Sequence, residues 1–148
     1  MNNIYRIIDA NINRVSEGLR VLEDLARFKC GEAYLTEEIK KLRHSIRKGV
    51  NDFYSQFLSS RDSVNDIGLE ISQKNQLDNK SNIKDLIIAN FKRVQEGLRV
   101  IEENFKIVGY YDTSKIYEQC RYPHILLKNY ITARLLKEEA FRLLIFIA

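Results

Sequence analysis

An arginine and two aspartates stand close together in a polar stretch near the middle of the chain. Arg61 is followed directly by Asp62, and Asp66 comes four residues later, before Gly68. Carboxylates at this spacing in a loop can hold Mg²⁺ while an arginine meets phosphate oxygens. The same residue types are also common in ordinary turns and helix caps. Arg61, Asp62 and Asp66 are therefore candidate catalytic residues, with the two aspartates as candidate metal ligands, and a plain turn remains the alternative.

A second candidate set surrounds a glycine. Asn11 and Arg14 flank Gly18 on or beside an apolar helical stripe. A glycine inside a helix costs about 1 kcal/mol relative to alanine, so close approach of another helix or of a ligand should offset it. The same three residue types recur 79 positions later, as Asn90, Arg93 and Gly97. Two interpretations stay open: a substrate-binding site, or polar residues that tie two copies together across a pseudo-twofold axis.

Charged residues beside these glycines complete the candidate substrate-binding set. Glu17 and Arg20 follow Arg14 in the first copy, and Glu96 is the counterpart of Glu17 in the second. Steps of three and four residues between opposite charges are typical of ion pairs on a solvated helix face. Together with Glu23 and Asp24, these residues fit either a solvated face or a ligand contact.

Other chemistries have weaker support. The basic run over residues 40–48 permits nucleic-acid binding, but it has no interleaved aromatic platform and fits a solvated or phosphate-facing helix better. The cysteines and histidines do not have the spacing of a structural zinc site. Neither a glycine-rich phosphate loop nor a dinucleotide fingerprint is present, so a nucleotide would have to be held by side chains and helix N-termini.

Two segments of the chain repeat one another. Residues 9–23 and 88–102 are identical at ten of fifteen positions, at a constant offset of 79. Apolar residues recur in both at steps of three and four, which is the period of one helix face. The pattern predicts a further helix after each copy, from Thr36 as N-cap to about residue 57, and from about residue 112 onward. We therefore expect an all-α fold, a helical bundle built from two duplicated helical hairpins with a long central linker.

The expected boundaries follow from this repeat. We predict a single domain over residues 1–148, with repeat units at about 4–58 and 81–131. The linker is expected at 59–80, ordered over 59–68 and loose over 69–80. Ser81 or Asn82 is the expected N-cap of the second copy. Pro123 should kink or restart the last helix, which leaves residues 134–147 as a fifth helical stretch.

Composition limits the class of protein. A chain of 148 residues with 45% hydrophobic and 30% charged residues is expected to be globular, and a net charge of +4 is mild. No segment resembles a signal peptide or approaches the length of a membrane span. Two cysteines make no disulfide framework. We therefore expect a cytoplasmic protein with no membrane partner, whose apolar residues 143–147 pack on the core or on a partner.

One long motif resembles a known family. The string RIIDANINRVSEGLRVLEDLARF at residues 6–28 resembles the helical domain that is fused ahead of thiamine phosphate synthase in many bacteria and that also occurs alone. Shorter similarities follow at Leu42-Arg43-His44, Arg61-Asp62, Asp66-Ile67-Gly68, Ala89-Asn90, Arg93, Gln95-Glu96 and Arg121-Tyr122. Pro123 and the tail after about residue 130 depart from the family. No synthase barrel follows, so we expect a stand-alone protein or an excised domain.

The resemblance implies an alternative hydroxymethylpyrimidine phosphate kinase with ATP as co-substrate and Mg²⁺ as cofactor. Transfer of the γ-phosphoryl group to the phosphorylated pyrimidine would give its diphosphate, and positioning would matter more than covalent chemistry from the protein. In this hypothesis arginines 14, 20, 61 and 93 hold phosphates and the two aspartates carry Mg²⁺. The asparagines meet the aminopyrimidine edge, with Glu17 or Glu96 as a second contact.

Two further interpretations remain at this point. The chain could be a non-catalytic module that dimerises or regulates a thiamine phosphate synthase, which would then be its partner. A basic nucleic-acid-binding helix is the least favoured. A duplicated helical pair also suits a homodimer, and the sequence leaves open whether the two copies form one composite site or two.

Overall fold

The computed structural model describes residues 2–62, 64–68 and 82–147, without the side chains at 124–126, 128, 130 and 135–147. Every regular element in these residues is helical, and they contain no strand. The elements are α1 (Asn2–Asp24), the π-helical η1 (Leu25–Lys29), α2 (Ala33–Lys48), the 3₁₀ turn η2 (Asn51–Phe53), α3 (Tyr54–Ser60), α5 (Ile83–Ile107) and α6 (Tyr111–Ile147). The predicted all-α class is confirmed.

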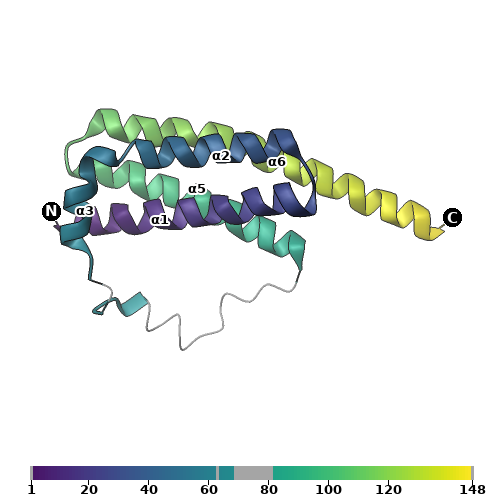
Figure 1. The fold of residues 1–148 in the computed structure, drawn as a ribbon, viewed down its shortest axis with the longest axis horizontal. Helices are drawn as coiled ribbons and strands as arrows, with labels where there is room; N and C mark the ends of the chain where they lie inside the picture. Colours follow the sequence, from purple (N-terminus) through teal and green to yellow (C-terminus); the bar gives the residue numbers. More distant parts are fainter. Residues whose placement is uncertain (1, 63, 69–81, 148) are drawn as a thin grey trace.

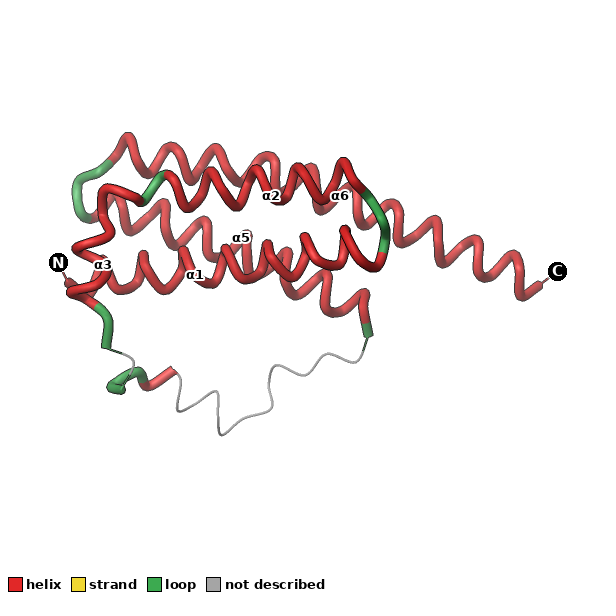
Figure 2. The backbone as a smooth tube through the Cα atoms, viewed as in Figure 1, coloured by secondary structure: helices red, strands yellow, loops and turns green. Residues whose placement is uncertain are grey.

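Four long helices form the body of the molecule. Figure 1 shows α1 and α5 lying together, with α2 and α6 alongside them, and the C-terminal part of α6 extending past the other helices. The main contacts join α1 to α5, α5 to α6 and α1 to α2. Short loops reverse the chain between α1 and α2 and between α5 and α6 (Figure 2). The two repeated segments therefore form the central helix pair of the bundle.

Apolar stripes at helical spacing fill the space between these helices. In α1 the buried residues include Ile8, Ile12, Val15, Leu19 and Leu22. Matching stripes come from α2, with Leu35, Ile39, Leu42 and Ile46, and from α5, with Phe91, Val94, Leu98, Ile101 and Phe105. Full burial of such a side chain contributes about 1.5–3 kcal/mol. The stripes that the periodicity predicted are the core.

The helix expected over residues 36–57 begins earlier and breaks in the middle. It begins at Ala33, and the Thr36 hydroxyl donates to the Glu32 carbonyl at 2.6 Å from inside the helix, so Thr36 is not the N-cap. At the other end the Tyr117 hydroxyl donates to the Ile46 carbonyl at 2.9 Å. The same hydroxyl would lie 2.8 Å from a Cβ on Gly49, so α2 ends where Tyr117 from α6 reaches it.

Pro123 does not restart the last helix. Helix α6 continues from Tyr111 to Ile147 with the proline inside, so 134–147 is not a separate fifth element. A proline removes one backbone hydrogen bond and crowds the preceding turn. Cys120, Leu127 and Ile131 are buried on either side of it, and this packing offsets the local cost.

The predicted cap of the second repeat is confirmed at Asn82, whose side chain accepts from the Asp85 amide at 2.8 Å. The first part of the linker is described up to Gly68, apart from residue 63, while residues 69–80, predicted to be loose, lie outside the described residues. Within the described chain, no helix combines the length and apolarity that a bilayer crossing requires.

Candidate functional site

The repeated glycines lie at a close approach of α1 and α5. A Cβ on Gly97 would lie 2.5 Å from Val15 Cγ2, and one on Gly18 would lie 3.0 Å from Val94 Cγ2. Val15 and Val94 occupy equivalent places in the repeat, so each glycine receives the valine of the other copy. Helix packing therefore explains both glycines, in agreement with the structural interpretation of this pattern.

Asn11 and Asn90 are buried beside this crossing. Each side-chain amide nitrogen donates to a carbonyl one turn earlier, Ile7 O and Leu86 O, at 2.8 Å in both cases. The Asn11 side-chain oxygen lies 3.7 Å from the Cβ position of Gly97, so it faces the other helix. The side-chain oxygen of Asn90 is buried, and none of the described residues forms a hydrogen bond with it. Contact of these amides with a substrate stays a prediction.

The charged residues of the predicted binding set lie on the outside of the same helices. Arg14, Glu17 and Glu96 are exposed and make no ion pair within the described part of the chain. Arg20 pairs with Glu23 at 3.5 Å and with Asp24 at 3.6 Å. Arg93 is half-buried, and its Cδ would lie 3.8 Å from a Cβ on Gly18, so its stem crosses α1 at the glycine. The charges of Arg14, Glu17 and Glu96 are thus available for a contact on this face.

Two glutamates at equivalent repeat positions are buried. Glu23 and Glu102 have side chains 7% and 3% exposed, so the expectation of a solvated face is wrong for Glu23. Glu23 lies 3.4 Å from Arg43 Nη2 on α2, and Glu102 lies 3.2 Å from Arg121 Nη2 on α6. Each repeat helix is thereby joined to the next helix by an ion pair, and pairing permits the burial. The identity of the two glutamates in the repeat, with an arginine in each following helix, was the signal for these pairs.

Arg61 is held on α1. Its Nε donates to Asp9 Oδ2 at 2.7 Å and its Nη2 donates to Asp9 Oδ1 at 3.0 Å. Asp9 is buried, whereas Arg61 is about half exposed. The hydrogen bonds that Arg61 donates to the Asp9 carboxylate raise the pKa of Arg61 above its ordinary value. The pair fixes the start of the linker to the first turns of α1.

The two aspartates make local turn contacts. Asp62 accepts from the backbone amide of Asn65 at 3.3 Å and from its side-chain amide at 2.7 Å, and these bonds lower the pKa of Asp62. Asp66 Oδ1 accepts from the Gly68 amide at 2.9 Å. The Asp62 carbonyl also accepts from Arg6 on α1 at 2.6 Å. Turn chemistry accounts for these contacts.

The donor set limits what metal could be held here. Among the described residues no three histidine, cysteine, aspartate or glutamate side chains gather as metal ligands. The exposed carboxylates of Asp62 and Asp66 fit Mg²⁺ that is held mainly by phosphate oxygens, rather than an ion enclosed by protein.

The candidate residues fall into two groups along α1. Arg61 and Asp62 are anchored near Arg6 and Asp9, in the first turns of the helix. Gly18 lies nine residues beyond Asp9, about 13 Å along the helix axis. Arg14 lies between these two points, so a ligand contacting both groups would have to lie along α1.

A comparison with known proteins places the chain in a family. The model of the ThiD2 family matches residues 6–129, from the first turns of α1 to beyond Pro123 in α6. The chain belongs to the ThiD2 family. The resemblance noted in the repeat motif is thereby confirmed at the level of family.

Relatives of this ThiD2 chain are longer proteins. It is 43% identical over 119 residues to a thiamine-phosphate synthase of Prochlorococcus marinus (strain AS9601), covering 80% of this chain and 32% of the relative. Thiamine-phosphate synthases of Nostoc punctiforme and Rhodopirellula baltica are each 36% identical, over 85% and 68% of this chain and 34% and 27% of theirs. The chain thus spans about a third of the length of these curated relatives. No solved structure matches it significantly.

Proposed function

We propose that this chain acts in thiamine phosphate formation as a helical module that binds a thiamine-phosphate synthase and regulates it. The observation that carries the proposal is the extent of the similarity. In relatives named thiamine-phosphate synthase, a segment similar to 68–85% of this chain occupies about a third of the protein. A module that accompanies a synthase within one chain is well placed to contact it from a separate chain.

The geometry of the described residues supports a binding role. Arg61 forms a bidentate pair with a buried carboxylate, and Asp62 and Asp66 make turn contacts. By contrast, Arg14, Glu17 and Glu96 are exposed without an ion pair in the described chain. Charged groups of this kind at the rim of an interface give orientation and specificity. The outer face of α1 and α5 is therefore the surface that we expect to meet the synthase.

The test uses the synthase portion of the Prochlorococcus marinus relative, without the segment that matches this chain. We expect the two proteins to form a complex in size-exclusion chromatography with light scattering, and the chain to change synthase turnover. Arg14→Glu should weaken the complex at least tenfold, while Arg47→Glu on the exposed side of α2 serves as the charge-matched control. Absence of a complex together with unchanged synthase turnover would overturn the proposal.

A second candidate is the phosphotransferase that the family resemblance implies, with hydroxymethylpyrimidine phosphate as acceptor. Exposed Asp62 and Asp66 fit phosphate-held Mg²⁺, and exposed Arg14 lies along α1 between Asp9, which holds Arg61, and Gly18 at the helix crossing. The bond between the γ-phosphorus of ATP and its bridging oxygen would break. A new bond would form to an oxygen of the acceptor phosphate, giving ADP and the pyrimidine diphosphate. The accepting oxygen is already ionised, so no general base is needed.

ADP release from Mg-ATP, with and without hydroxymethylpyrimidine phosphate, separates the two candidates. Acceptor-dependent ADP together with the diphosphate by mass spectrometry selects the phosphotransferase, and Asp62→Asn should then reduce turnover. Complex formation with the synthase and no ATP turnover selects the module.

A further inference from the structure

The side of α6 that faces away from the bundle carries exposed residues at regular spacing. Leu127 and Ile131 are buried, so they mark the side of α6 that packs on the other helices. Tyr122, Asn129 and Ala133 are exposed, and Tyr122 is 66% exposed although it is aromatic. A helix turns by about 100° per residue, so these three residues lie on the side opposite to the buried pair.

The exposed residues belong to a longer repeat. Steps of four and three residues alternate through positions 122, 126, 129, 133, 136, 140, 143 and 147, all within α6. Seven of these eight positions hold apolar residues, and Asn129 is the exception. An apolar row with a mean step of 3.5 residues over about four heptads is typical of the contact between two long helices. We call these eight positions the α6 seam.

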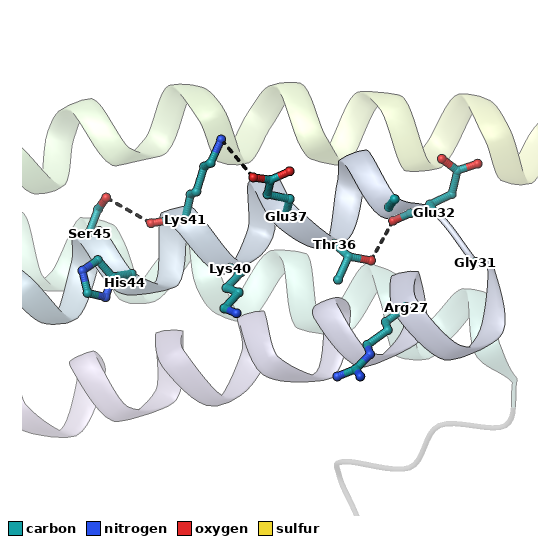
Figure 3. A pocket seen from close by; sticks show the side chains of 10 residues that line it. Arg27, Gly31, Glu32, Thr36, Glu37, Lys40, Lys41, His44 and Ser45 are labelled. Atoms are coloured by element: carbon teal, nitrogen blue, oxygen red, sulfur yellow. Dashed lines mark hydrogen bonds and ion pairs between the residues drawn. The ribbon is translucent and has the colours of Figure 1, made fainter.

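The last part of α6 extends past the rest of the bundle. Arg134 pairs with Glu32 in the turn before α2, which Figure 3 shows beside Gly31. Beyond that turn α6 continues past the other described helices (Figure 1). From Tyr122 to Ile147 the seam is about 38 Å long. Its far half therefore has no partner helix in the described part of its own chain.

We propose that the α6 seam is the contact with a second copy of this chain. Its period suits another helix, because two helices that supercoil around each other keep such a row face to face. A twofold axis brings the same row from each copy together, so that one contact covers both rows. Ala133 and Ala140 allow the two backbones to approach closely. Asn129, the single polar residue, fixes the register at a cost in stability.

This contact is separate from the features shared with the family and from the proposed function. The ThiD2 model ends at residue 129, so five of the eight seam positions lie beyond the matched region. The surface assigned above to the synthase lies on α1 and α5, whereas the seam lies on α6. A dimer formed through the seam would carry two copies of that surface.

Sedimentation equilibrium of the full chain over about 1–100 µM, the range that reveals a micromolar Kd, tests the proposal. We expect a concentration-dependent rise to twice the monomer mass. Leu136→Glu/Leu143→Glu should weaken the association at least tenfold, because it places charges without partners in the seam. Asn129→Leu should strengthen the association, since it removes the polar residue, and a folding defect would not produce this gain. Circular dichroism at the lowest concentration checks that each variant is helical.

The control Phe141→Glu/Ile145→Glu makes the same kind of change at two apolar positions of α6 outside the seam, and it should leave the dimer intact. Equal weakening by the control would show general apolar association and overturn the proposal. A dimer that the seam variants leave unchanged, or a monomer up to roughly 100 µM, would overturn it as well. If the chain alone is monomeric and the seam variant loses binding to the synthase portion, the seam contacts the synthase and the second copy is the wrong partner.

Discussion

Arg61 has the residue type expected for phosphate chemistry, and its geometry gives it a structural partner. Its two donor nitrogens match both oxygens of Asp9, a residue that is only 5% exposed. A buried carboxylate without a partner is costly, so the arginine has a structural reason to be there. The sequence could identify the arginine but not its partner, which lies 52 residues away.

Arg61→Ala should lower the free energy of unfolding by about 1–3 kcal/mol, because Asp9 would be left buried without its counterion. The loss should be smaller than the ~3–5 kcal/mol typical of breaking a fully buried ion pair, since Arg61 is half exposed. Urea unfolding followed by circular dichroism measures the change. The double variant Asp9→Asn/Arg61→Gln, which removes both charges, should recover part of the loss. If Arg61→Ala leaves the stability unchanged but abolishes acceptor-dependent ADP release from Mg-ATP, Arg61 has a catalytic rather than a structural role.

Cys120 should react slowly with thiol reagents. Burial raises its pKa to about 11, so the reactive thiolate is about a thousandth of the total at pH 8. In a Cys30→Ser variant, which leaves Cys120 as the single thiol, Ellman's reagent should react only over hours in buffer and within seconds in guanidinium chloride. Rapid reaction of the folded variant would contradict the burial of Cys120 on α6.

At the scale of elements, the crossing of α1 and α5 depends on two glycines that are not equally constrained. The Cβ of an alanine at 97 would overlap Val15 Cγ2 at 2.5 Å, whereas at 18 the nearest atom, Val94 Cγ2, is at 3.0 Å. Valine is branched at Cβ and changes rotamer with difficulty, so relief requires movement of the helices.

Gly97→Ala should therefore destabilise the bundle by about 1–3 kcal/mol, although alanine alone would favour the helix by about 1 kcal/mol. Gly18→Ala should cost less. Adding Val15→Ala to Gly97→Ala should restore part of the loss, because it removes the overlapping methyl groups. Urea midpoints of the four proteins test the order, and a Gly97→Ala variant as stable as the parent would mean that the helices are further apart than described.

The helix stripes could be read from the sequence because they depend on local spacing, whereas the helix ends could not. Ile39, Leu42 and Ile46 lie in the core as their period predicts. The end of α2 is set by Tyr117, which reaches the Ile46 carbonyl from 71 residues away. The continuation of α6 through Pro123 likewise depends on packing on both sides of the proline. Contacts between distant residues overrode local preference in both places.

At the scale of the whole molecule, the repeat left open whether its two copies contact each other, and the structure shows that they do, since Gly18 and Gly97 each meet the other copy. For the candidate site, the sequence predicted which residues take part but not how each one is placed. Spacing placed Asn11 and Arg14 beside the crossing, but it could not tell that Asn11 is buried while Arg14 is exposed.

Charge pairs spread over the molecule should make its stability depend on pH on the acid side. The hydrogen bond from Lys106 lowers the pKa of Glu103, and the hydrogen bond from Lys115 lowers the pKa of Glu118. Asn65 lowers the pKa of Asp62 in the same way. These groups bind protons less readily in the folded protein than in the unfolded chain, whose values are near 4.5 for glutamate and 3.8 for aspartate.

The stabilisation from these carboxylates is therefore present above about pH 4.5 and is lost as the pH falls through the lower folded values. We expect the Tm to be nearly constant from pH 7 to 5 and to fall from pH 4.5 to 3, when followed by circular dichroism at low ionic strength. Glu103→Gln/Glu118→Gln should have a lower Tm at pH 7 and a shallower fall, because two of the titrating groups are gone. Added salt should reduce the difference between variant and parent, since the Lys106–Glu103 pair is exposed and the Lys115–Glu118 pair is partly exposed, so that solvent ions screen both. A parent and variant with parallel curves would show that other carboxylates control the acid transition.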